Sequence, residues 1–87
     1  MDEFEAKKEE GLRLFQQGRQ KEALAVFETA VSLAQAADNP AGEAEMLSNT
    51  GVIQRVQGNF PEAQTAFSQA EKLFTQVGDV NGQGQVL

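Results

Sequence analysis

The chain carries the sequence GLRLFQQGRQKEALAVFETAVSL at residues 11–33, and its pattern returns 40 residues later as GVIQRVQGNFPEAQTAFSQAEKL at residues 51–73. Repetition at a fixed spacing is typical of a stacked array of supersecondary units. The pattern therefore predicts a repeat protein whose function depends on its surfaces rather than on a buried catalytic cleft. Six positions recur in register: Gly11 and Gly51, Gly18 and Gly58, Ala23 and Ala63, Phe27 and Phe67, Ala30 and Ala70, Leu33 and Leu73.

Each repeated unit has the residue pattern of two helices joined by a short turn. Gly18 ends the first helix, and Asp38 or Asn39 can cap the helix that Pro40 begins. Pro61 lies in the first turn of the last helix, and no stretch alternates as a strand does. We therefore expect an all-α fold in which short loops make neighbouring helices antiparallel, so that each unit is a helical hairpin. The expected helices cover about residues 3–17, 20–37, 40–57 and 60–77.

The pattern begins a third time near the end of the sequence. Gly82 takes the place of Gly42, and Leu87 takes the place of Leu47. The start of a further helix is therefore expected there, as a short helical stub. We expect a single domain over residues 1–87, with repeats over about 4–39 and 40–79 and a partial third repeat over 80–87.

Composition narrows the classes of function. The 87 residues contain neither Cys nor His, which removes thiolate nucleophiles, imidazole bases and the usual transition-metal ligands. Close carboxylate pairs such as Glu9 and Glu10 fall on expected exposed helix turns, where acidic residues are ordinary. We expect no catalytic site, no metal site and no cofactor, and hence no enzyme activity.

The charge and hydropathy of the chain bear on its partners and its location. The net charge of −6 works against binding to phosphate backbones, which needs clustered Lys and Arg. No apolar run approaches the ~20 residues of a membrane span, and the charged start lacks the apolar core of a signal peptide. We expect a cytoplasmic protein that neither binds nucleic acid nor inserts into a membrane.

The repeated glycine, alanine and phenylalanine positions resemble those of the tetratricopeptide repeat. In that pattern, small residues such as Gly11 and Ala23 let helices approach closely, while Phe27 and Phe67 fill the space between hairpins. The resemblance covers nearly the whole chain and implies a right-handed superhelical array. The 40-residue spacing is similar to the longer repeats of the kinesin light chain and of polarity adaptors that bind extended peptides.

The resemblance implies a function as a protein-interaction scaffold or adaptor. In this family the first helices of successive repeats line a concave face that binds a partner peptide or helix. The spacings of three and four residues agree, because they place these residues along one side of each helix. The positions carried over to this face are Lys8, Leu12 and Phe15 from the first helix and Asn49, Val52, Arg55 and Val56 from the third.

Individual members of this concave set admit different roles. The resemblance implies that Asn49 hydrogen-bonds the backbone of an extended ligand, and an amide can both donate and accept. Its alternative is an ordinary exposed amide. Lys8 and Arg55 could pair with acidic groups of a ligand. Leu12 and Val52 could equally belong to the core between repeats.

The end of the second unit offers a different surface. Arrays of this type need about three units for stability, so the apolar residues at this edge should be covered. The alternative hypothesis is therefore a self-assembling module, a homodimer formed through this edge, or a fragment of a longer repeat protein. The residues of the expected self-assembly edge are Leu73, Phe74, Val77, Val86 and Leu87.

Overall fold

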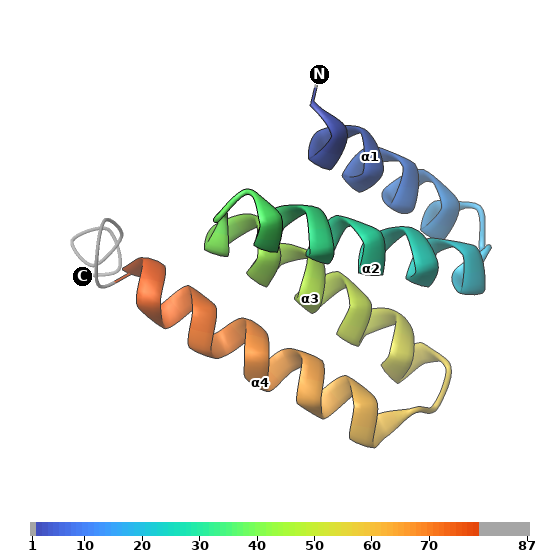
Figure 1. Ribbon diagram of the computed structural model, residues 1–87. Helices are drawn as coiled ribbons and strands as arrows, with labels where there is room; N and C mark the ends of the chain where they lie inside the picture. The colour runs from blue at the N-terminus through green and yellow to red at the C-terminus, as the bar shows by residue number, and fades with distance from the viewer. Residues whose placement is uncertain (1, 79–87) are drawn as a thin grey trace.

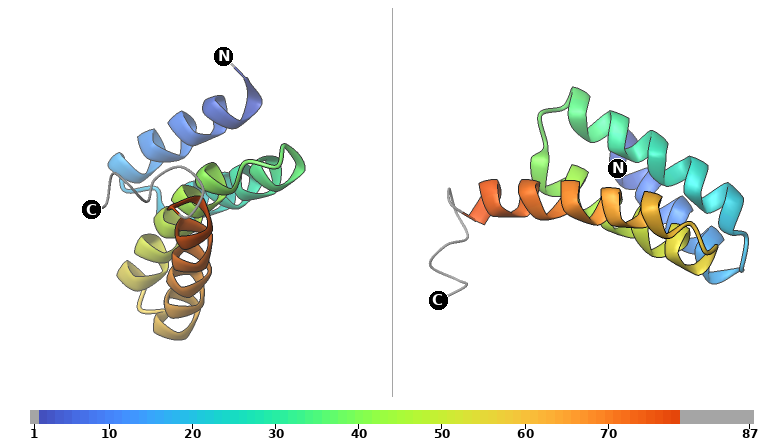
Figure 2. Two further views of the ribbon diagram at one scale, coloured as in Figure 1. Left: turned by 90° about the vertical axis from the view of Figure 1, so that its left-hand side faces the viewer. Right: turned by 90° about the horizontal axis from the view of Figure 1, so that it is seen from below.

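The computed structural model describes residues 2–78 and contains four helices in that range, which confirms the expected all-α fold. Successive helices pack against each other, so that α1 contacts α2, α2 contacts α3, and α3 contacts α4. α1 and α4 lie at opposite ends of this stack, as Figure 1 and the left-hand view of Figure 2 show. The helix bounds agree with the expected ones to within one residue: α1 Glu3–Gln16, α2 Gln20–Ala36, α3 Pro40–Val56 and α4 Phe60–Val77.

The turns inside the two hairpins are set by glycine. Gly18 and Gly58 have φ values of 79° and 84°, in the left-handed region that suits a residue without a Cβ atom. After α1, the N–H of Arg19 donates to the carbonyl of Leu14 at 2.9 Å, and the N–H of Gly18 donates to that of Phe15 at 3.0 Å. This pair of bonds closes the helix as a Schellman motif, and the turn after α3 repeats it.

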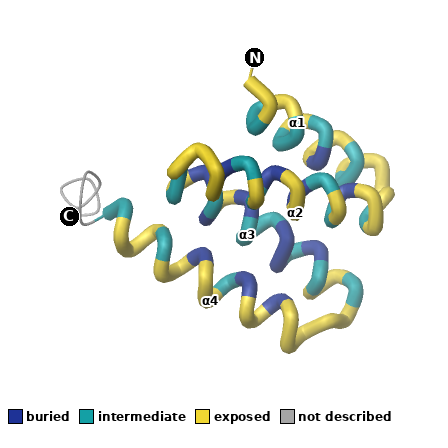
Figure 3. Tube along the Cα trace, in the orientation of Figure 1, coloured by how far each residue is buried: buried dark blue, intermediate teal, exposed yellow. Residues whose placement is uncertain are grey.

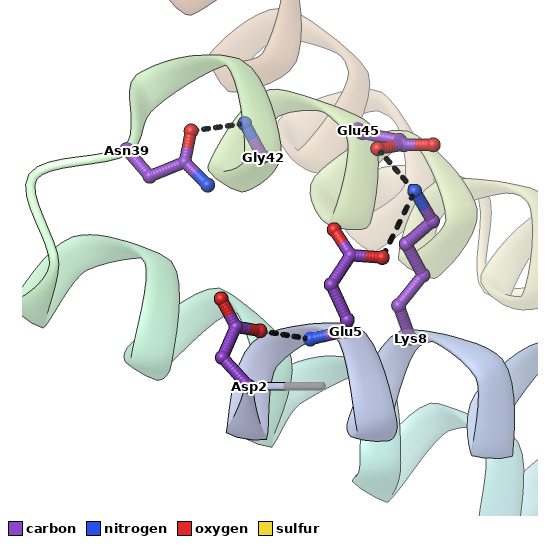
Figure 4. Close-up of polar contacts among 6 residues, drawn as sticks. All are labelled: Asp2, Glu5, Lys8, Asn39, Gly42 and Glu45. Carbon is purple, nitrogen blue, oxygen red and sulfur yellow. Dashed lines mark hydrogen bonds and ion pairs between the residues drawn. The ribbon is translucent and has the colours of Figure 1, made fainter.

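The turn between the hairpins uses two polar residues for different purposes. Asp38 adopts a φ of 54° at the end of α2, where the other two turns have glycine. Asn39 is the cap of α3, since its side-chain oxygen accepts a hydrogen bond from the N–H of Gly42 at 3.1 Å (Figure 4). Of the two candidate caps in the sequence, the structure selects Asn39.

The loss of the Asn39 cap is expected to be measurable. Asn39→Ala should lower the free energy of unfolding by about 1 kcal/mol, because one helix-terminal N–H loses its acceptor. Asn59→Ala is the matched control, since Asn59 precedes α4 without a capping hydrogen bond from its side chain. Urea unfolding followed by circular dichroism measures both, and equal losses would contradict the assigned role of Asn39.

The core lies between the two hairpins, where α2 meets α3. Ala23, Phe27 and Ala30 of α2 are buried together with Met46 and Ile53 of α3. Figure 3 shows the buried positions concentrated on these two middle helices. α1 contributes only glycine 11 to the fully buried set, so the N-terminal helix covers the core without being enclosed itself.

The repeated glycines allow the close approach that the sequence pattern predicts. A Cβ atom built on Gly11 would lie 2.5 Å from Cε1 of Phe27, and one on Gly51 would lie 2.9 Å from Cε1 of Phe67. Each phenylalanine ring therefore occupies the space of a missing side chain in its own hairpin. The two units differ in burial, because Phe27 is enclosed while Phe67, expected in the same role, is only half-buried.

Candidate functional site

Four large apolar side chains are exposed in the described part of the chain, and they fall on two surfaces. Leu12 of α1 and Val56 of α3 have exposed fractions of 37% and 55%. Phe60 and Phe74 of α4 have exposed fractions of 63% and 47%. Because water-exposed apolar groups that cluster often mark contact sites, each pair indicates a candidate binding surface.

The first pair lies on the helices that the family resemblance assigns to the concave face. α1 and α3 are joined there by an ion pair between Nζ of Lys8 and a carboxylate oxygen of Glu45 at 3.4 Å. The same ammonium group lies 3.9 Å from Glu5 within α1 (Figure 4). Lys8 is therefore engaged by two carboxylates of its own chain, and a ligand would have to compete with them.

Two other predicted concave residues face different surroundings. Phe15 packs against the buried core cluster, so much of its surface serves the fold. The guanidinium carbon of Arg55 lies 5.7 Å from the centre of the Phe67 ring, a cation–π contact with α4. The remaining predicted residues are Leu12, Asn49, Val52 and Val56, which we call the concave strip. Asn49 and Val52 are half-buried in it.

The second pair lines a groove of about 880 Å³ between α3 and α4. Its wall on α3 includes Ser48 and Arg55, and α4 supplies the rest. We call this groove the open face, because it lies on the side of α4 where a further repeat would stack. Its principal members on α4 are Phe60, Ala63, Gln64, Phe67, Ser68, Ala70, Glu71, Phe74 and Thr75.

The open face includes two phenylalanines that the repeat pattern does not assign to a surface. The pattern places Phe67 in the core and gives no role to Phe60. The signal that could have identified them is the seven-residue spacing of Phe60, Phe67 and Phe74, which places all three on one side of a helix. The open face thus has a row of three phenylalanines along α4, with the small side chains of Ala63 and Ala70 between them.

The predicted self-assembly edge is only partly on the open face. Phe74 lines the groove, whereas Leu73 lines a smaller groove with Gln35 and Glu43 on another side of α4. Val77 is half-buried at the end of the helix. The other two predicted members, Val86 and Leu87, lie outside the described residues.

The open face is not a copy of the surface that joins the two hairpins. In the first unit, Leu24 and Val31 are partly buried apolar residues that pack against the core. Their equivalents 40 positions later are Gln64 and Glu71, which are exposed on the open face. The same positions of the repeat therefore carry apolar residues where a helix covers them and polar residues where none of the described helices does.

Residues 2–78 have neither a carboxylate cluster suited to a metal ion nor a helix suited to crossing a membrane. None of the described carboxylates form a group of three or more that could hold a metal ion. Among the described helices, none has the combination of length and apolar content required to cross a membrane. The two apolar surfaces are therefore the features of the described chain that carry a functional argument.

Comparison with known proteins agrees with the repeat pattern. The family model described as "Tetratricopeptide repeat" matches residues 10–76, more than three quarters of the 87 residues. No curated protein and no solved structure gave a significant match. The match spans both hairpins as one segment, so the boundary between the repeats stays a prediction. The chain belongs to the tetratricopeptide repeat family.

Proposed function

We propose that the chain is a protein-interaction module that binds a segment of a protein partner on the concave strip. Tetratricopeptide repeats generally mediate contacts between proteins, and the family is typically a non-enzymatic scaffold. We choose this face because Leu12 and Val56 are exposed on α1 and α3, the first helices of the two hairpins. We also propose that the protein acts as a scaffold in the cytoplasm and does not bind nucleic acid.

The chemistry of the concave strip suits an extended or helical peptide with apolar side chains. Leu12, Val52 and Val56 offer apolar contact area, and the half-buried Asn49 offers one amide that can donate to and accept from a peptide backbone. The Lys8–Glu45 ion pair bridges α1 and α3 beside this strip, although partly exposed pairs of this kind contribute little to stability. The partner's specificity would then depend on the spacing of its apolar residues more than on its charge.

Capture of partners from a native lysate tests the proposal. Asn49→Ala and Val56→Asp should each weaken capture of a specific partner at least tenfold, about 1.4 kcal/mol or more of binding free energy. Both side chains are at least partly exposed, so circular dichroism and melting should stay close to those of the unmodified chain. Thr29→Asp on α2 is the control for an added charge at an exposed site away from the strip.

Two outcomes would contradict the concave assignment. One is that both concave variants capture the same proteins as the unmodified chain. The other is that Thr29→Asp reduces capture as strongly as Val56→Asp does, since a general effect of charge would then explain the loss. Quantitative mass spectrometry of the captured proteins distinguishes these outcomes from selective loss of one partner.

A further inference from the structure

The open face has the pattern of a surface that receives a helix. In the first unit, Ala23, Phe27 and Ala30 are buried where α2 meets α3. Their equivalents on α4 line the open groove: Phe67 is half-buried, while Ala63 and Ala70 are only 4% and 3% exposed and form its floor. Because the first set is covered by a helix, the second set has the residue types and spacing to pack against one as well.

The occupant should differ from a helix that packs as α3 does. Ala34 of α2 is completely buried, and its equivalent on α4 is Phe74. Close-packed interiors leave little room for a larger side chain at such a position. A helix placed on α4 as α3 is placed on α2 would therefore collide with the Phe74 ring. A helix that packs on the open face therefore needs a small residue opposite Phe74.

We propose that this occupant is α4 of a second copy of the chain, packed antiparallel about a two-fold axis. Antiparallel pairing can place Phe67 opposite Ala70 of the second copy and Phe74 opposite Ala63. By symmetry each contact occurs twice, because residue i meets j and j meets i. Each large ring then lies against a small side chain, the alternation that lets two helices interdigitate.

The charges on the open face agree with pairing of like copies. Arg55 and Glu71 are the charged residues that line the groove, one of each sign, whereas the whole chain has a net charge of −6. The open face is thus locally neutral on an acidic protein, which reduces repulsion between copies. The antiparallel register sets Glu71 near the uncharged Gln64 of the second copy rather than beside its Glu71.

The oligomeric state provides the first test. Sedimentation over roughly 1 to 100 μM should show a reversible monomer–dimer equilibrium. Phe74→Glu should weaken dimerisation at least tenfold, since a carboxylate would enter an apolar contact. Ala25→Glu is the matched control, because Ala25 is an exposed alanine of α2 remote from the groove and should leave the equilibrium unchanged.

Disulfide trapping tests the antiparallel register independently of affinity. The chain lacks cysteine, so single-cysteine variants report on one position each. Ser68 lies beside the proposed two-fold axis, so Ser68→Cys should form a disulfide-linked dimer on mild oxidation. Thr75 lines the same groove, but in this register two copies of Thr75→Cys would be about 20 Å apart along the antiparallel helices, beyond the reach of a disulfide.

The outcomes separate the possible occupants. A monomer at all concentrations would overturn the proposal, because no second copy would then occupy the open face. Equal trapping of Ser68→Cys and Thr75→Cys would overturn the antiparallel register in favour of parallel or random contact. Neither measurement involves the concave strip, so failure here leaves the test of partner capture unaffected.

Discussion

Phe27→Ala is expected to lower the free energy of unfolding by about 3–5 kcal/mol. The Phe27 side chain is 1% exposed and lies in the core cluster that joins α2 to α3. Its removal would both lose apolar contact area and leave a cavity beside Gly11. Since proteins of 87 residues have stabilities of roughly 4–13 kcal/mol, this loss would remove a large share of the stability of the fold. Urea unfolding followed by circular dichroism measures the loss.

Phe67→Ala is the matched comparison, because Phe67 holds the same repeat position at the other end of the array. Its ring is half-buried rather than enclosed, so the same truncation should cost about 1–2 kcal/mol in the monomer. The comparison belongs at the lowest usable protein concentration, where any association of copies contributes least. Equal losses for the two variants would show that Phe67 is as well covered in solution as Phe27, contrary to the arrangement described above.

The helices could be predicted from sequence because their ends depend on local chemistry. Gly18 and Gly58 adopt a backbone conformation that glycine favours, and Pro40 and Pro61 fit the first turn of a helix. These constraints act within a few residues and need no knowledge of the neighbouring repeat. They therefore locate the ends of the helices, and the recurrence of Gly, Ala and Phe adds the hairpin arrangement.

The candidate binding surfaces are harder to predict from sequence because they depend on the neighbouring helices rather than on the local pattern. Phe15 and Arg55 occupy the same repeat position, yet Phe15 packs on the core and Arg55 lies over the Phe67 ring at the open face. Lys8, which we expect to pair with acidic groups of a ligand, lies 3.4 Å from a carboxylate oxygen of Glu45 on α3, and its position in the repeat does not predict that contact. Residues at the same position of the repeat therefore have different surroundings, because different helices lie beside them.

Gly11→Ala is expected to destabilise the protein by up to about 2 kcal/mol, although alanine favours a helix by ~1 kcal/mol over glycine. The added Cβ would lie 2.5 Å from Cε1 and 2.8 Å from Cδ1 of Phe27, closer than carbon atoms can pack. The ring cannot move aside easily because it is enclosed in the core, and overpacking of this kind costs ~1–3 kcal/mol. Chemical denaturation curves of the variant and the unmodified chain measure the difference.

Gly51→Ala provides the control that separates overpacking from helix propensity. Both glycines lie within helices, so the propensity gain is nearly the same in the two variants and cancels in their difference. The Cβ at position 51 would lie 2.9 Å from the Phe67 ring, but this ring borders the open groove and can shift outward. Gly51→Ala should therefore be close to neutral. If it destabilised as much as Gly11→Ala, the Phe67 ring would have to be held as firmly as that of Phe27, which requires something to cover the open face.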